Sequence, residues 1–120
     1  MQIPRNAVLL RIFIGEDDKH DGKPAYEAIV LKARKMGLGG ATVLRGPMGF
    51  GHSSHLHTAK ILRLSEDLPM VIEIVDSEAK INEFLPALDG MMTSGLVTIE
   101  KVQVLLYGTG NPGETPAHGE

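Results

Sequence analysis

Leu68-Pro-Met-Val-Ile-Glu-Ile-Val75 is the clearest strand in the sequence, because apolar and β-branched residues fill it. Pro69 is tolerated there, since it stands at the start of the strand. Asp76 and Ser77 follow and can cap a helix. The spacing of the next apolar side chains predicts that helix, with a stripe formed by Ile81, Phe84, Leu85, Leu88 and Met92. Pro86 falls inside the pattern, and we expect a kink or a local break there.

The remaining elements lie on both sides of this strand and helix. Residues 7–14 and 41–44 predict two strands upstream, and residues 102–107 predict the last strand. A helix between the first two begins at Pro24 and ends at Gly37, with an apolar face formed by Ala25, Ile29, Ala33 and Met36. The order β-α-β-β-α-β predicts an α+β, ferredoxin-like sandwich, in which two helices cover one face of a four-stranded antiparallel sheet.

Both faces of the predicted sheet carry apolar side chains. In strand 7–14 the even-numbered residues are apolar, yet Leu9 and Phe13 on the other face are apolar as well. The strand predicted over 102–107 shows the same feature. An apolar second face needs cover, and the predicted elements include no third helix to supply it. We therefore expect self-association in a closed, symmetric homo-oligomer.

Length and composition set the class of protein. The 120 residues fit one domain, which we place at residues 1–108, followed by a tail at 109–120 whose Pro, Gly and charge predict disorder. Lys and Arg total 12 against 15 Asp and Glu, and this acidic balance argues against nucleic-acid binding. Cysteine is absent, which excludes disulfides and thiol catalysis. No apolar run approaches the ~20 residues of a membrane span, so we expect a cytoplasmic protein without membrane insertion.

A glycine-rich loop after the second strand is the sharpest candidate site. Gly46, Gly49 and Gly51 permit positive φ and close approach of backbone N–H groups to an anion. Arg45 could hold phosphate oxygens in a bidentate manner, and Lys23, just before a helix N-terminus, could help to hold an anion. The simpler interpretation is a loop that needs glycine only in order to turn sharply.

Three histidines in the same loop suggest a second kind of site. A metal centre would use His52, His55 and His57, whereas the simpler interpretation is a polar loop with solvated imidazoles, which we favour. Ser54 beside a histidine could serve a hydrolase, but the loop offers no orienting third group. The acidic run 16–21 could bind a hard cation, although a solvated connecting loop is the better interpretation.

A known family shares several stretches with this chain. They are Gly39-Gly-Ala-Thr-Val-Leu-Arg-Gly46, Gly49-Phe-Gly51, Leu68-Pro-Met-Val-Ile-Glu-Ile-Val-Asp76, Gly15-Glu16, Gly22-Lys-Pro24 and Tyr26-Glu27. In this combination they resemble the PII-like signalling proteins, in the branch catalogued as domain of unknown function 190. The resemblance covers residues 7 to 108.

The resemblance implies a homotrimer whose sheets face the three-fold axis, and a T-loop over about residues 46–60. In PII proteins that loop engages a membrane transporter, a channel or an enzyme, and adenine nucleotides bind at its base in clefts between subunits. The match to the family motif makes Gly49, Phe50 and Gly51 candidates for contact with the nucleotide. Thr42 on the preceding strand is a further candidate.

Two departures from the PII pattern bear on the ligand. The Gly-Asp-Gly-Lys phosphate loop of PII proteins is replaced by Thr-Ser-Gly-Leu-Val-Thr at residues 93–98, and the last predicted strand ends without arginines. These departures count against triphosphate binding in the PII manner. The leading interpretation is therefore a non-enzymatic regulatory trimer with a small effector, such as an adenine nucleotide with fewer phosphates. The alternative is a metal-responsive trimer similar to the CutA proteins, which would use the three loop histidines.

Overall fold

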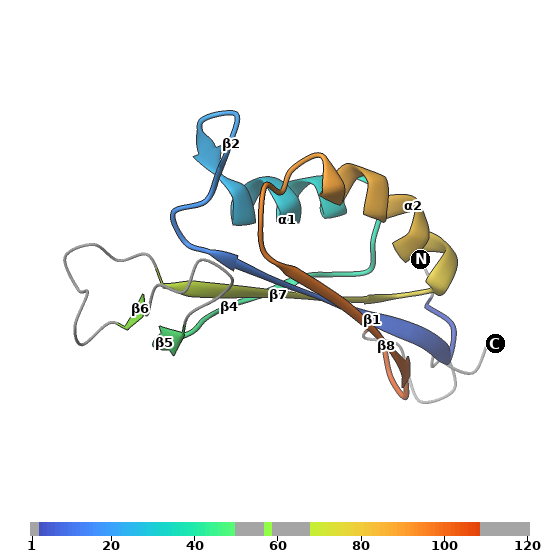
Figure 1. Cartoon of the computed structure of the whole chain (residues 1–120). Helices are drawn as coiled ribbons and strands as arrows, with labels where there is room; N and C mark the ends of the chain where they lie inside the picture. The colour runs from blue at the N-terminus through green and yellow to red at the C-terminus, as the bar shows by residue number, and fades with distance from the viewer. Residues whose placement is uncertain (1–2, 50–56, 59–67, 109–120) are drawn as a thin grey trace.

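A four-stranded antiparallel sheet with two helices on one face forms the body of the molecule (Figure 1). The computed structural model describes residues 3–49, 57–58 and 68–108. The sheet and helix layers contain β1 (Asn6–Gly15), α1 (Ala25–Lys35), β4 (Thr42–Arg45), β7 (Pro69–Asp76), α2 (Glu78–Asp89) and β8 (Leu96–Gln103). Two short hairpins are added by β2 (Lys19–His20) with β3 (Lys23–Pro24), and by β5 (Met48–Gly49) with β6 (His57–Thr58).

The sheet order is β4-β7-β1-β8, and every neighbouring pair is antiparallel. Two βαβ halves that are joined in this order give the ferredoxin-like topology, so the predicted fold is confirmed. Within the described residues no helix is long and apolar enough to cross a membrane. The tail predicted at 109–120 lies outside the described residues.

The core lies between the helices and the central strands. Alternate residues of β1 and β7 face the helices and are buried, which follows from the two-residue period of a strand: Val8, Leu10, Ile12, Ile14, Met70, Ile72 and Ile74. The helices supply the opposing layer with Ala25, Ile29, Ala33, Ile81, Phe84 and Leu88. Both predicted helical stripes therefore pack as expected.

Both helices have ends that their sequences encode. At the end of α1, Gly37 has a φ of +81°, its N–H donates to Arg34 O, and Leu38 N–H donates to Ala33 O, a Schellman motif. The prediction that Gly37 ends this helix is confirmed. At the start of α2, Ser77 Oγ accepts a hydrogen bond from Lys80 N at 3.1 Å. Helix α2 continues through Pro86 to Asp89, so the predicted local break is not present.

The last strand begins earlier than the sequence pattern indicates. Strand β8 starts at Leu96 and ends at Gln103, whereas residues 104–107 leave the sheet. Val104 N–H donates to Arg5 O at 2.7 Å, and the Tyr107 hydroxyl donates to Gly39 O at 2.6 Å, beside the opposite edge of the sheet. The prediction of a strand over 102–107 is therefore confirmed for residues 102 and 103 and wrong for residues 104–107. Because β8 is an edge strand, exposed along almost its whole length, no burial pattern marked it in the sequence.

The face of the sheet away from the helices is the open face. Its side chains form cross-strand rows in the strand register, and an apolar row lies beside a polar row. The apolar row consists of Leu44, Val71, Phe13 and Leu96, and the polar row consists of Thr42, Glu73, Arg11 and Thr98. Leu44 and Leu96 are 49% and 55% exposed. The single chain thus confirms the expectation that strand β1 carries apolar side chains on both of its faces.

Candidate functional site

The loop base is the place where β4 ends, β7 begins and β1 ends. We use this name for Glu16, Arg45, Gly46, Gly49 and Pro69. Gly46 N–H donates to Pro69 O at 2.8 Å, and Glu16 N–H donates to Leu68 O at 2.8 Å. Both ends of the segment from 46 to 68 are therefore fixed to the sheet at the same place.

Two glycines of the candidate site pack against a proline. A Cβ built on Gly46 would lie 2.9 Å from Pro69 Cγ, and one built on Gly49 would lie 3.1 Å from the same atom. Neither glycine has a positive φ, which corrects the expectation for these two positions. Glycine is needed at 46 because a side chain would collide with Pro69, so close packing explains that position without a ligand.

Arg45 is the cation of the loop base, and Glu16 is its partner. The guanidinium Nη2 of Arg45 donates to Glu16 Oε2 in an ion pair. The Arg45 side chain is 57% exposed, whereas that of Glu16 is 17% exposed. The prediction that residues 16–21 form a solvated loop is therefore wrong for Glu16. The exposed guanidinium still has N–H groups that could donate hydrogen bonds to an oxyanion, because one carboxylate oxygen accepts from only part of them.

Thr42 and Lys23 lie apart from the loop base. Alternation along β4 places Thr42 on the open face, opposite Glu73, and Arg45 on the helix side, opposite Met70. Lys23 is exposed in the hairpin that leads into α1, which stands on the helix side of the sheet (Figure 1). Of the predicted ligand residues that are described, the structure thus brings together Arg45, Gly46 and Gly49.

The remaining candidates fall in the loop itself. Phe50, Gly51, His52 and His55 lie outside the described residues. His57 belongs to β6, where it pairs with Gly49 in the register. Among the described residues no group of three His, Asp or Glu side chains could hold a metal ion. The CutA-like alternative stays a prediction from the sequence.

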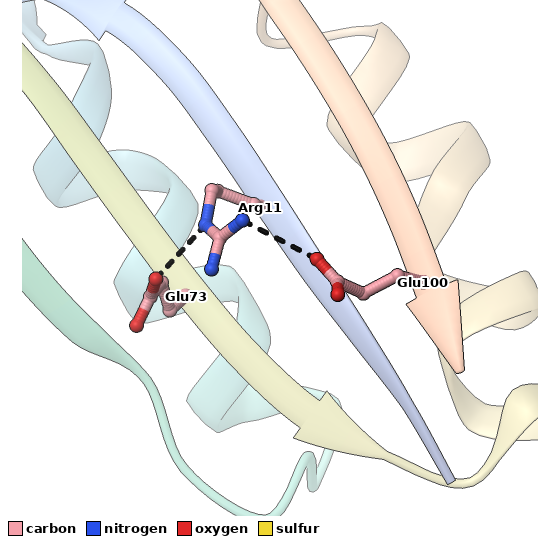
Figure 2. Close-up of polar contacts among 3 residues, drawn as sticks. All are labelled: Arg11, Glu73 and Glu100. Atoms are coloured by element: carbon pink, nitrogen blue, oxygen red, sulfur yellow. Dashed lines mark hydrogen bonds and ion pairs between the residues drawn. The ribbon is translucent and has the colours of Figure 1, made fainter. Parts of the chain in front are cut away.

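An ion cluster at the centre of the open face was not predicted. Arg11 Nε donates to Glu73 Oε2 at 2.9 Å, and Arg11 Nη1 to Glu100 Oε1 at 3.4 Å (Figure 2). The three side chains come from β1, β7 and β8 and are only partly covered, so each pair contributes little to stability in the isolated chain. The signal was present in the sequence, because Arg11 and Glu73 each interrupt an otherwise apolar strand.

A groove of about 660 Å³ lies at the end of the open face away from the loop base. Its lining includes Leu9, Thr42 and Val75 from the sheet, and Leu105 and Tyr107 from the segment after β8. The groove is mainly apolar and open. Thr42 thus belongs to this groove rather than to the loop base.

Buried Asp76 fixes the rim of this groove. It is 2% exposed, and its Oδ2 accepts a hydrogen bond from Gly39 N at 2.8 Å, while its Oδ1 accepts one from Ser77 N at 2.6 Å. A Cβ on Gly39 would lie 2.4 Å from Ile3 Cδ1, so a larger residue there would displace the end of the Ile3 side chain. These contacts join the start of β4 to the start of α2.

Relatives of the chain occur in Aquifex aeolicus and in Methanocaldococcus jannaschii. Residues 7–104 match the family catalogued as domain of unknown function 190, described as "Uncharacterized ACR". A UPF0166 protein of Aquifex aeolicus is 42% identical over 97 residues, which are 81% of this chain and 91% of that protein. A UPF0166 protein of Methanocaldococcus jannaschii is 37% identical over 99 residues, which are 82% of this chain and 91% of that protein.

A solved structure shares the fold. It is that of CPII, a nitrogen regulatory PII-like protein from Thiomonas intermedia K12, bound to ADP, AMP and bicarbonate. The TM-score is 0.64 at 18% sequence identity, and the match covers 82% of this chain and 88% of that chain. The resemblance to PII-like proteins that the sequence motifs carry is confirmed by this fold and by the family match. The chain belongs to the family catalogued as domain of unknown function 190, and it shares its fold with a PII-like protein.

Proposed function

We propose that this protein is a non-enzymatic, PII-like regulatory protein that binds a small anionic effector at the loop base. The observation that carries the proposal is the exposed guanidinium of Arg45, placed where both ends of the segment 46–68 join the sheet. An adenine nucleotide with one or two phosphates is the effector we favour. CPII shares the fold and is bound to ADP, AMP and bicarbonate, which supports this choice of candidates.

The proposed assembly is a homotrimer with the open faces turned toward the three-fold axis. The apolar row, with Leu44 and Leu96 about half exposed, supports this assembly because burial of such side chains is favourable. In PII proteins the effector lies in the clefts between subunits. The same arrangement here would place Arg45, Gly46 and Gly49 beside a neighbouring copy, with Phe50 and Gly51 as further contacts and Thr42 and Lys23 as outlying candidates.

The proposed mechanism is a population shift. An effector that binds one conformation of the T-loop, residues 46–60, more tightly than another shifts the loop toward the first conformation. The loop would then present a different surface to a partner protein, such as a membrane transporter, a channel or an enzyme. The cytoplasmic location expected from the sequence remains a prediction.

Calorimetric titration of AMP, ADP and ATP into the wild-type protein tests the proposal. We expect micromolar binding at best, with ATP no tighter than ADP, because the PII phosphate-loop lysine and terminal arginines have no counterparts here. Arg45→Ala should weaken ADP binding about tenfold, the loss of one charge-assisted hydrogen bond. Gly51→Val should also weaken binding while the oligomer stays intact. No binding of any nucleotide below millimolar concentration would contradict the proposed effector.

A further inference from the structure

The carboxylate of Glu16 is held at the loop base by a hydrogen bond to one of its two oxygens. Its Oε2 accepts from Arg45, whereas its Oε1 is buried and has no hydrogen-bond partner among the described residues. Glu16 is also anchored by its backbone, because its N–H donates to Leu68 O at 2.8 Å. Removal of the paired cation from a mostly buried carboxylate is unfavourable, because it leaves the charge uncompensated.

The Glu16–Arg45 pair joins two strands that are not neighbours in the sheet. Glu16 directly follows β1, Arg45 is the last residue of β4, and β7 lies between these strands. Through its backbone Glu16 contacts one end of the segment 46–68, and through its side chain it contacts the residue before the other end. One residue therefore holds both ends of the β4–β7 connection.

We infer that Glu16 competes with the anionic effector for Arg45 and thereby sets the affinity of the site. The inference rests on the proposed function, since it concerns the same guanidinium. A phosphate group that takes the fork of Arg45 in a bidentate manner must share it with Glu16 or displace Glu16. Displacement leaves a largely buried carboxylate without its cation, and that cost is subtracted from the binding free energy of the ligand.

The competition has a structural consequence. When the effector takes Arg45, the side-chain contact between the end of β1 and the end of β4 is released, while the backbone bonds to Leu68 and Pro69 need not change. Glu16 is thus a positioning residue that couples occupancy of the site to the geometry of the loop base. A purely structural ion pair would behave differently, because its removal would leave ligand affinity unchanged or weaken it through disorder.

Titration of ADP into matched variants at fixed ionic strength tests the inference. Glu16→Gln keeps the size of the side chain and removes the charge, so it should tighten ADP binding about fivefold, the range of a partly exposed ion pair. The matched control is Asp21→Asn, which removes one negative charge from the exposed tip of the β2–β3 hairpin and should change affinity less than about twofold. Glu16→Met is the second variant, with the same expected gain, should the glutamine variant not fold.

A double variant separates competition from a general effect of charge. In an Arg45→Ala background, Glu16→Gln should give no gain in ADP affinity, because the group for which Glu16 competes is gone. An equal gain in both backgrounds, or no gain in the wild-type background, overturns the inference while ADP binding itself stands. Absence of ADP binding in the wild type and in every variant contradicts the proposed function instead.

Discussion

Asp76 is a buried carboxylate whose hydrogen bonds join residues far apart in the chain. The pair Asp76-Ser77 was predicted to cap a helix, and Ser77 does so. Asp76 instead accepts a hydrogen bond from Gly39, 37 positions earlier in the chain. Local spacing predicts caps because they lie within one turn, whereas a contact of this range depends on the assembled sheet. The Glu16–Arg45 pair was missed for the same reason.

The buried carboxylate of Asp76 should therefore matter more than its surface neighbours. Asp76→Ala would leave the N–H of Gly39 without its acceptor, and the free energy of unfolding should fall by about 1–3 kcal/mol. Urea denaturation at one protein concentration measures the change. Glu83→Ala, which alters an exposed position of α2, is the control and should stay within about 0.5 kcal/mol of wild type. Equal stability of the two variants would show that the hydrogen bonds of Asp76 contribute nothing measurable to the free energy of unfolding.

Among the elements, β1, β4, β7 and both helices were predicted, whereas the edge strand β8 was predicted only in its last two residues. Strand β7 and both helices show the periodicity of a buried face, so their sequences encode their positions. Strand β8 exposes Leu96, Val97 and Ile99, so its sequence shows no buried face. The run 102–107 is more apolar than β8, and it was mistaken for the strand for that reason.

The cap of α2 gives a prediction at the scale of the element. Ser77→Ala removes the oxygen that accepts from Lys80 N, and the free energy of unfolding should fall by about 1 kcal/mol. Ser77→Asp retains an acceptor and adds a favourable charge at the helix N-terminus, so its stability should remain near that of wild type. Thermal unfolding of the three proteins compares them directly. A loss as large in Ser77→Asp as in Ser77→Ala would argue against the cap as the cause.

For the whole molecule, the candidate site was predicted in part. Arg45, Gly46 and Gly49 do meet at the loop base, because they are close in sequence and β4 ends there. Thr42 lies on the other face of the sheet, which the two-residue period of a strand already implies. The position of Lys23 depends on the β2–β3 hairpin, whose two-residue strands are too short to show a periodic pattern in the sequence.

The apolar row gives a test of assembly. Phe13 lies in this row between Val71 and Leu96, so Phe13→Glu would place a charge in the proposed subunit interface and should convert the trimer to monomers. Leu31→Glu is the matched control, since Leu31 is 59% exposed on α1 and lies away from the open face. Sedimentation velocity at micromolar concentration distinguishes the two. Trimers in both variants would show that the open face is not the interface.

Native mass spectrometry of the gently purified protein, with and without added ADP, tests the central claim most directly. The claim is that copies of this chain assemble as a trimer and bind a nucleotide at the loop base between them. We expect the mass of three chains with up to three ADP molecules bound, and an intact trimer with less bound ADP at the same ADP concentration in Arg45→Ala. A monomer that takes up no ADP would contradict it.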